Sequence, residues 1–517
     1  MKYKSFFDPA TQTEKARPDQ VLNNAGGYVF KLSPDEQLKR FLVLGSDQPT
    51  YYVNAKKLTI DNAACVAACL QLDARATVNT IISMRTRAPK VNSVLFAYAM
   101  ACSPKYVSNL QDRAYALEQL KKICWTSTQL FEWVAYVKQF RGWGRALKRA
   151  VKLWYMERDE RGLALQLTKY RQRDGWTHRD VLRLAHPKVI AERSPYLGWA
   201  VGKSTLINDP LIQAFNHVQT LDNPAKVAQA ITDNDLSWEH IPTPMLKYPE
   251  VWEALLPNMG GTAMLRNLGR MTVNGLLTPL SDASKLVVTK LADTIGMRNI
   301  HPISVLLASK TYSAGHGQQG KLTWVPDQSI CAALETAFQA AFAEIPVNNS
   351  RVMLALDISG SMYAPLQCAP NFSCAEATGV MSMVFAKRFP NHFIMGFSDK
   401  FIKLPINSSM SLDRVMEAIR SLNFGPTDCS LPALHATAHK MNVDCFIVMT
   451  DNETYYGKTH PYAALQKYRS TNLGKGKQIV MGMTSTGFTI ADPLDAHSLD
   501  VVGFDSGVLP LTQDFIG

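Results

Sequence analysis

The sequence predicts an α + α/β chain, in which a body of helical repeats precedes a doubly wound domain built on a parallel β-sheet. Up to about residue 345, apolar residues recur at helical spacing and strand-like alternation is scarce. Beyond Pro346, short apolar runs alternate with helix-like stretches. The charge changes at the same point, because residues 346–517 hold 13 Lys and Arg against 14 Asp and Glu in a chain of net charge +12. We therefore expect two domains, 1–345 and 346–517.

The first part reads as a succession of helices joined by short turns. Helical periodicity is clear at residues 66–72, 94–100, 114–123, 147–155 and 332–342. Turn signals that contain glycine or proline, such as Gly142-Trp143-Gly144 and His186-Pro187, separate these stretches. Many short helices with short connections indicate an α-solenoid that stacks helix pairs. The absence of a strict repeat period leaves HEAT-like stacking as an expectation about architecture.

The second part alternates strands and helices. Strand-like runs occupy residues 351–357, 393–397, 445–451 and 478–483, and helix-like runs occupy residues 375–388, 431–441 and 461–468. Ligands of such sheets bind beyond the carboxyl ends of the strands. Asp357 and Asp451 both fall at such ends, so we expect a functional site there.

The residues around these strand ends have the chemistry of a metal site. Asp357, Ser359 and Ser361 form an Asp-x-Ser-x-Ser motif, and Thr427 lies in a later turn. Carboxylate and hydroxyl oxygens are hard ligands, so the set Asp357, Ser359, Ser361, Thr427 and Asp451 predicts a divalent cation, with Mg²⁺ preferred. The alternative for the motif alone is a capped turn before a helix. Asp428 and Glu453 lie nearby, either supporting the ligands or as solvated loop charges.

Basic residues gather in one segment of the helical part. Residues 138–193 contain 15 basic and 6 acidic side chains, which suits a polyanionic partner. Three successive helices each offer a cationic face, and Trp143, Tyr170 and Trp176 offer rings that stack on unpaired bases. The candidate RNA contacts are Arg145, Lys148, Arg149, Lys152, Lys169, Arg173, Arg179, Arg183 and His186. The alternative is a solvated helix surface, with His186 as a plain helix-end residue.

The histidines, the cysteines and the apolar runs say less about function. His435 and His439 have a zinc-compatible spacing but no evident third ligand, so surface or core histidines are the better interpretation. The nine cysteines show no disulfide framework. With neither a secretory signal nor a membrane-length apolar run, we expect a cytoplasmic protein.

Long stretches of the chain resemble the Ro ribonucleoprotein autoantigen family, which joins an RNA-binding TROVE module to a von Willebrand factor A domain. TKYRQRDGW at 168–176 and GFTIADP at 487–493 are among the most specific. Others lie at residues 12–21, 23–30, 40–46, 315–317, 320–322, 427–432 and 450–454. The five oxygen ligands, in their order, resemble the metal-ion-dependent adhesion site of von Willebrand factor A domains.

This resemblance implies a ring of HEAT-like repeats whose ends the A domain bridges. It implies binding of small Y RNAs on the outer basic surface, and of single-stranded 3′ ends of misfolded RNAs in the central hole. It also implies roles in RNA quality control and stress survival, with a 3′-to-5′ exoribonuclease as partner of bacterial members, and we expect a monomer. The Y-RNA contacts of the family match Lys169, Arg173 and His186. Residues 190–250 have no secure match, so contacts there stay unassigned.

Two rival interpretations remain. The first is an adhesion or scaffold protein whose metal grips a partner's carboxylate; the A domain alone fits this, but the basic segment has no part in it. The second is a metal-dependent hydrolase. Against the hydrolase, no paired general acid and base and no activated nucleophile accompany the metal ligands. We therefore expect no catalysis.

Overall fold

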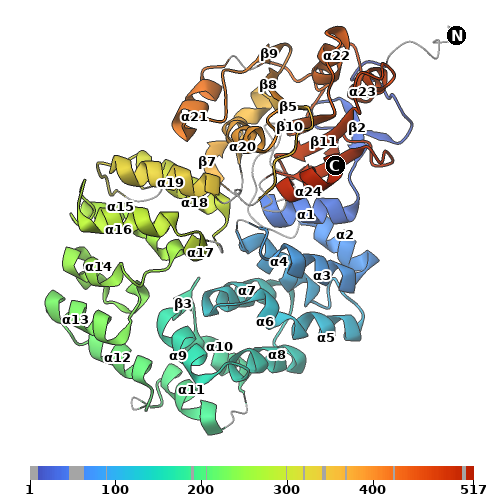
Figure 1. Cartoon of the computed structure of the whole chain (residues 1–517). Helices are drawn as coiled ribbons and strands as arrows, with labels where there is room; N and C mark the ends of the chain where they lie inside the picture. Colours follow the sequence, from blue (N-terminus) through green and yellow to red (C-terminus); the bar gives the residue numbers. More distant parts are fainter. Residues whose placement is uncertain are drawn as a thin grey trace. The chain divides into compact units, whose positions relative to one another are not determined.

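The computed structural model describes residues 10–45, 63–88, 90–187, 191–204, 207–297, 300–317, 321–340, 345–366, 369–422, 425–503 and 508–517. The chain forms two compact units (Figure 1). The helical unit comprises Leu70–Arg85 and Val94–Ala341, and the sheet unit comprises Met1–Cys69, Thr86–Ser93 and Phe342–Gly517. Helix α2 (Ala64–Leu72) begins in the sheet unit and ends in the helical unit.

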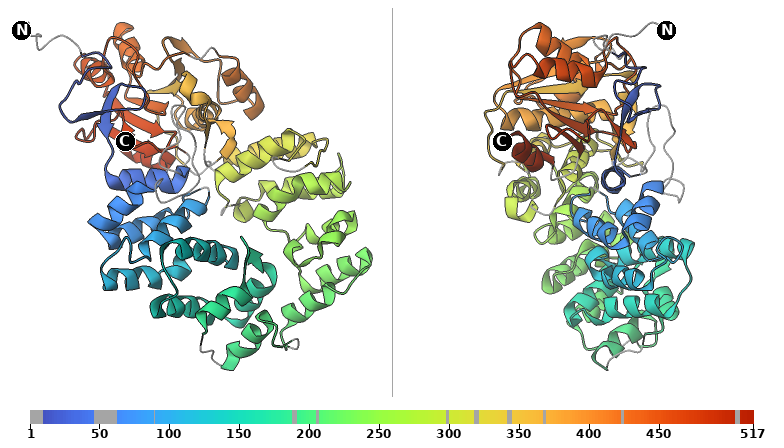
Figure 2. Two further views of the ribbon diagram at one scale, coloured as in Figure 1. Left: turned by 180° about the vertical axis from the view of Figure 1, so that it is seen from behind. Right: turned by 90° about the vertical axis from the view of Figure 1, so that its right-hand side faces the viewer.

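The helical unit is a series of short helices that pack on their neighbours, for example α13 on α14 and α18 on α19 (Figure 2). Its first helices are α3 (Ala74–Met84), α4 (Asn92–Ala101), α5 (Leu110–Glu118), α6 (Leu120–Ile123), α7 (Ser127–Phe140), α8 (Arg145–Met156), α9 (Glu160–Lys169), α10 (His178–Ala185) and α11 (Ser194–Ala200). They continue as α12 (Pro210–Val218), α13 (Pro224–Asn234), α14 (Pro249–Leu255), α15 (Gly261–Val273), α16 (Asp282–Ala292), α17 (Thr294–Met297), α18 (Pro302–Ser313) and α19 (Gln328–Ala340).

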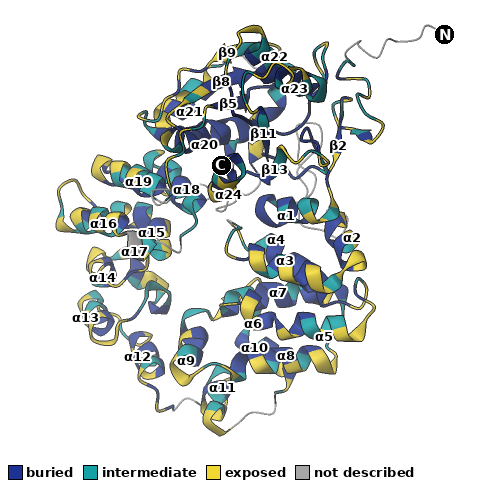
Figure 3. Ribbon diagram, turned by 45° about the vertical axis from the view of Figure 1, so that its right-hand side comes forward, coloured by how far each residue is buried: buried dark blue, intermediate teal, exposed yellow. Residues whose placement is uncertain are grey.

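The predicted helices of this unit are confirmed, with small differences at their ends. The stretch expected at 114–123 is two helices, because α5 ends at Glu118 and α6 begins at Leu120. The last two residues of the stretch expected at 332–342 lie outside the described residues. Most of these helices turn one side inward and leave the other exposed (Figure 3), whereas α4 is buried from Ser93 to Ala101.

The sheet unit is built on a six-stranded sheet in the order β13-β11-β10-β5-β8-β9. Its strands are β5 (Val352–Asp357), β8 (His392–Phe397), β9 (Phe401–Lys403), β10 (Cys445–Thr450), β11 (Lys477–Gly482) and β13 (Ser498–Val502). All neighbours are parallel except β8 and β9. The associated helices are α20 (Cys374–Arg388), α21 (Leu412–Arg420), α22 (Leu431–Ala438), α23 (Pro461–Arg469) and α24 (Val508–Ile516).

Helices cover both faces of this sheet, which confirms the doubly wound prediction. Met353 and Ala355 of β5 share a buried cluster with Ala433 of α22 and Ala464 of α23. The residues between them along β5 point the other way because side chains alternate along a strand. Helix α20 packs on β5 as well, and α24 packs on β13.

The N-terminal described residues belong to the sheet unit. Strand β1 (Gln20–Leu22) pairs with β2 (Tyr28–Lys31), and β2 pairs with β12 (Phe488–Thr489). Helix α1 (Pro34–Leu44) packs on β13. The sequence pattern grouped residues 1–345 together, whereas residues 10–45 complete the C-terminal fold.

A buried ion pair holds α1 in place. Arg40 is fully buried, and its Nη2 lies 2.5 Å from Oδ1 of Asp500 on β13. Its Nη1 donates to the carbonyl oxygens of Thr486 at 3.3 Å and Phe488 at 3.1 Å. The guanidinium therefore connects α1 to β13 and to the segment around β12.

Candidate functional site

The parallel sheet brings the two predicted strand-end carboxylates together. Strands β5 and β10 run side by side in register, so Asp357 at the end of one lies beside Asp451, directly after the other. Backbone amide Gly360 N donates to the carbonyl of Gly425 at 3.0 Å, which brings the Thr427 turn to the Asp-x-Ser-x-Ser loop. Each of the five predicted metal ligands is buried, between 0% and 4% exposed: Asp357, Ser359, Ser361, Thr427 and Asp451.

Hydrogen bonds fix these oxygens in a compact group. The hydroxyl oxygens of Ser359 and Ser361 lie 3.0 Å apart, and Ser361 also bonds to the Asp451 carboxylate. Oδ1 of Asp357 accepts from Ser359 N at 2.9 Å, and its Oδ2 accepts from Thr450 Oγ1 at 2.6 Å. Thr450 was missed in the sequence because a threonine at the end of a strand gives no signal of its own.

The electrostatics of the group fit a bound cation. Burial, followed by the charge of Asp451, raises the pKa of Asp357 to about 7. Burial also raises the pKa of Asp451, whose Oδ2 is buried and has no hydrogen-bond partner among the described residues. Two buried carboxylates beside hydroxyl oxygens form a hard, anionic donor set, which matches the preferences of Mg²⁺ or Ca²⁺.

The cationic helices also form as expected. Arg145, Lys148, Arg149 and Lys152 lie along the outer side of α8, exposed or half-exposed. The opposite side of α8 buries Leu147, Val151, Trp154 and Tyr155. This amphipathic division places the charges of α8 where a large anion reaches them.

A tight hairpin links the second and third cationic helices. Strand β3 (Gln172–Arg173) pairs with β4 (Trp176–Thr177) around Asp174 and Gly175, which both have positive φ. Thr177 caps α10 with Asp180 in a capping box. Arg173, Arg179, Arg183 and His186 are exposed, and His186 ends α10 in the left-handed region, with φ 43°.

Known proteins share both parts of this arrangement. A TROVE domain model matches residues 21–221 and 231–311, and a Ro60 vWA domain model matches residues 351–516. The chain belongs to the Ro60 family. The nine cationic candidates all lie within the TROVE match, and the five predicted metal ligands all lie within the vWA match.

Relatives from distant organisms match almost the whole chain. The RNA-binding protein RO60 of Caenorhabditis elegans is 34% identical, covering 98% of this chain and 91% of its own length. The RNA-binding protein RO60 of Deinococcus radiodurans is 37% identical, covering 96% and 95%. The crystal structure of the Deinococcus radiodurans RO (RSR) protein matches with a TM-score of 0.72 at 35% identity, covering 94% of this chain and 99% of that one.

Two acidic residues beside the ligands bind the N-terminal segment of this Ro60-family chain. Glu453 Oε1 accepts from Asn24 Nδ2 at 2.7 Å, and its Oε2 accepts from the backbone of Ala25 at 3.1 Å. Burial, then the charge of Asp451, raises the pKa of Glu453 to about 8. Asp428 accepts hydrogen bonds from Gln12 and from Ser430. The sequence left open whether Asp428 and Glu453 support the ligands or are solvated loop charges; both side chains are buried, so they are not solvated.

The same N-terminal segment holds the backbone of the ligand loop. Asn23 Nδ2 donates to the carbonyls of Asn452 at 3.1 Å and Thr454 at 2.7 Å. A Cβ on Gly27 would lie 1.8 Å from the Thr454 carbonyl oxygen, so only glycine fits there. Residues 23–27 therefore position the loop that follows Asp451, a role that no motif near Asp357 reveals.

Lys169 is less free than the other cations. Its Nζ lies 3.6 Å from Oε2 of Glu239, which lies in the 3₁₀ turn Trp238–His240, and both side chains are only about a fifth exposed. Arg173 lies 3.6 Å from Asp174, but both of these side chains are half exposed. Glu239 lies outside the basic segment 138–193 and far from Lys169 along the chain, so the sequence alone did not reveal this ion pair.

His178 joins the three cationic helices and was not singled out in the sequence. Its Nδ1 accepts from the Tyr155 hydroxyl of α8 at 2.9 Å. Its Nε2 lies 3.1 Å from the carbonyl oxygens of Gln166 in α9 and Tyr170 just after it, so Nε2 carries the proton. Burial lowers the pKa of His178 to about 4, which keeps the ring neutral.

His435 and His439, whose spacing is compatible with zinc, lie side by side in the structure. The rings of His435 and His439 stack with centroids 4.2 Å apart, and His435 also packs on Phe401. Within the described part of the chain, no group of three or more His, Cys, Asp or Glu side chains has the geometry of a metal site. No helix among the described residues is both long enough and apolar enough to cross a bilayer.

Proposed function

We propose that this Ro60-family protein binds structured noncoding RNA of the Y type on the cationic surface of α8, the β3–β4 hairpin and α10. The observation that carries the proposal is the continuity of this surface, because His178 bonds the three helices together and their cations face outward. Phosphate contacts from Arg and Lys release counterions and supply affinity. The relatives named RNA-binding protein RO60 support it.

We further propose that the protein binds single-stranded 3′ ends of misfolded noncoding RNA, acting in cytoplasmic RNA quality control and stress response as a monomer. A 3′-to-5′ exoribonuclease is the partner that such an activity needs. Family membership supports these roles, and the buried thiols of Cys102, Cys124, Cys429 and Cys445 suit a reducing compartment.

The test of the RNA surface is a triple variant, Lys169→Ala with Arg173→Ala and His186→Ala. We expect weaker binding of a structured RNA and a flatter salt dependence, since each lost phosphate contact removes about 0.7 to 0.9 from the slope. The matched control replaces Lys285, Lys290 and His217, which lie on α16 and α12. Gel-shift titrations over a salt series measure both variants. Equal losses in the two variants, or none in the first, would contradict the assignment.

We also propose that the sheet unit binds Mg²⁺ through Asp357, Ser359, Ser361, Thr427 and Asp451. Asp451 Oδ2 supports this proposal, because it is buried and has no hydrogen-bond partner in the part of the chain that the structure describes. A bound divalent cation would present positive charge to an outside carboxylate, so the second candidate function is a scaffold that grips an acidic residue of a partner. No activated nucleophile is proposed at this site, and we expect no RNA turnover by the purified protein.

Asp357→Ala separates the two activities. We expect it to abolish Mg²⁺ binding by the full chain, measured by calorimetry. RNA affinity should stay within about twofold, because Asp357 lies on β5 and the cationic candidates lie on the helices between residues 145 and 186. Ser409→Ala, an exposed substitution in the sheet unit, is the control. RNA affinity falling as far as in the triple variant, with the fold intact, would place the metal in the RNA site.

A further inference from the structure

The helices that follow the cationic surface carry the opposite charge. Between residues 204 and 260 the sequence has seven acidic and two basic side chains. Asp209 caps α12, Asp233 accepts from Gln229, and Glu239 pairs with Lys169. Glu250 and Glu253 on α14 are exposed and have no ion-pair partner among the described residues. The helical unit thus presents an acidic region directly after its basic one.

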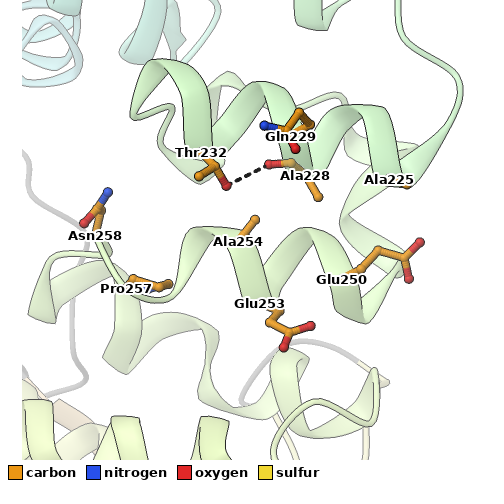
Figure 4. A pocket seen from close by; sticks show the side chains of 9 residues that line it. All are labelled: Ala225, Ala228, Gln229, Thr232, Glu250, Glu253, Ala254, Pro257 and Asn258. Carbon is orange, nitrogen blue, oxygen red and sulfur yellow. Dashed lines mark hydrogen bonds between the residues drawn. The ribbon is translucent and has the colours of Figure 1, made fainter.

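These two glutamates border a groove between α13 and α14. The hollow has a volume of about 520 Å³, and Figure 4 shows the two helices side by side with the lining side chains. The four residues of α13 that line the groove are spaced i, i+3, i+4 and i+7, so they lie on one face of that helix. The full lining is Ala225, Ala228, Gln229, Thr232, Glu250, Glu253, Ala254, Pro257 and Asn258. Small side chains therefore form the floor and carboxylates lie on the α14 side.

A second, larger hollow adjoins this groove. It has a volume of about 850 Å³ and shares Thr232 and Asn258 with the first. We call the two together the acidic trough, because its carboxylates outnumber the two cations of its lining, Arg161 and Lys169. Asp235 adds a further carboxylate to its lining. Trp238 Nε1 is a buried polar atom of this lining without a hydrogen-bond partner among the described residues, whereas Glu239 is paired with Lys169. The trough thus combines apolar floor, negative charge and unused hydrogen-bonding capacity.

We propose that this acidic trough docks a cationic α-helical segment of a protein partner. Its alanine floor allows a helix backbone to approach closely, and its carboxylates pair with lysine or arginine at helical spacing. RNA fits poorly, because phosphates would face an excess of carboxylates that includes Glu250, Glu253 and Asp235. Lys169, a cation of this lining, is already paired with Glu239. The cationic surface and the acidic trough therefore serve different partners on one unit, one a nucleic acid and the other a protein.

The test uses the full chain and a fluorescein-labelled helical peptide of alanine with lysines spaced i, i+4. Glu250→Lys with Glu253→Lys should weaken peptide binding about tenfold or more, because each substitution removes an attraction to a lysine of the peptide and adds a repulsion. The control is Glu118→Lys with Asp282→Lys, which makes the same change in charge at exposed positions of α5 and α16. Fluorescence anisotropy reports binding, and the control should keep the native affinity.

A second variant separates shape from charge. Ala228→Trp fills the floor of the groove without altering a charge, and Ala228 is only half-buried, so the fold should tolerate it. We expect it to weaken the peptide as well, and a photo-crosslinker on the peptide to label residues 225–258. Neither variant should change RNA affinity, which keeps this test independent of the RNA surface. Native peptide affinity in Ala228→Trp, equal loss in the charge control, or labelling elsewhere would overturn the proposal.

Discussion

Replacing Arg40 tests whether α1 is an integral part of the sheet unit. Arg40→Met keeps most of the side-chain volume but removes the charge that pairs with Asp500. The variant leaves a carboxylate only 6% exposed without its partner. Breaking a buried pair on one side costs about 3 to 5 kcal/mol, a large part of the roughly 5 to 15 kcal/mol that stabilises a typical domain.

The assay is thermal unfolding of the full chain, with hydrogen exchange of β10 and β11 assigning the transition to the sheet unit. A loss of this size should lower the Tm of that transition by roughly 6 to 20 °C, at about 2 to 4 °C for each kcal/mol. The double variant Arg40→Met with Asp500→Asn removes the unpaired charge and keeps a polar group beside Thr489. It should recover much of the loss.

The pH dependence has a definite sign. Burial raises the pKa of Asp500 while the charge of Arg40 lowers it, so Arg40→Met should raise that pKa further. A carboxyl group whose pKa is raised on folding destabilises the folded state at pH values above its pKa in the unfolded chain, and has no such effect below that pKa. The difference in stability between the native protein and Arg40→Met should therefore shrink as the pH falls toward about 4. A Tm unchanged by Arg40→Met, or a double variant no better than the single one, would refute this account of α1.

Two further predictions follow from the helical unit. Burial lowers the pKa of His178 to about 4, so the stability that the neutral ring contributes should be complete above about pH 6.5. The free energy of unfolding of the native protein should fall by about 3 kcal/mol as the pH drops from there to about 4, whereas His178→Phe should be less stable at neutral pH and lose less on acidification. Unfolding measured over a pH series tests this, and an equal loss in both proteins would exclude His178 as the titrating group. For RNA, we expect recognition of structure and not of sequence, because phosphate contacts carry no base information. An RNA with an intact or scrambled single-stranded 3′ tail should compete with a labelled one, and a tailless duplex should compete poorly; equal competition by the tailless RNA would exclude tail binding.

Features that depend on close neighbours could be read directly from the sequence. The capping box of Thr177 and Asp180 spans one helical turn, and the division of α8 into buried and exposed sides follows from helical spacing. Asp357 and Asp451 were placed together because parallel strands end at one edge of a sheet. In each case the geometry is set by local backbone structure or by a general rule of topology.

Features that depend on distant pairing left no such signal. Glu239 lies beside Lys169 only because the turn before Ile241 folds against α9. His178 looks like an ordinary helical residue until Tyr155 and Gln166 are seen around its ring. Helical periodicity indicates which side of a helix is buried, but it does not indicate which residue lies against that side. These contacts are therefore visible only in the folded structure.

The N-terminal segment shows where sequence boundaries and folding units diverge. The change in charge and periodicity near Pro346 correctly marks where the parallel sheet begins along the chain. However, β12 pairs with β2, and the buried carboxylate of Glu453 accepts hydrogen bonds from Asn24 and Ala25. A fragment that starts near residue 346 would leave that strand edge and that carboxylate without these partners, and unmade hydrogen bonds of buried groups cost about 1 to 3 kcal/mol each. The unit that holds the candidate metal site therefore needs residues 10–45 as well as 346–517, because what completes a fold is the burial of its polar edges and not continuity of the chain.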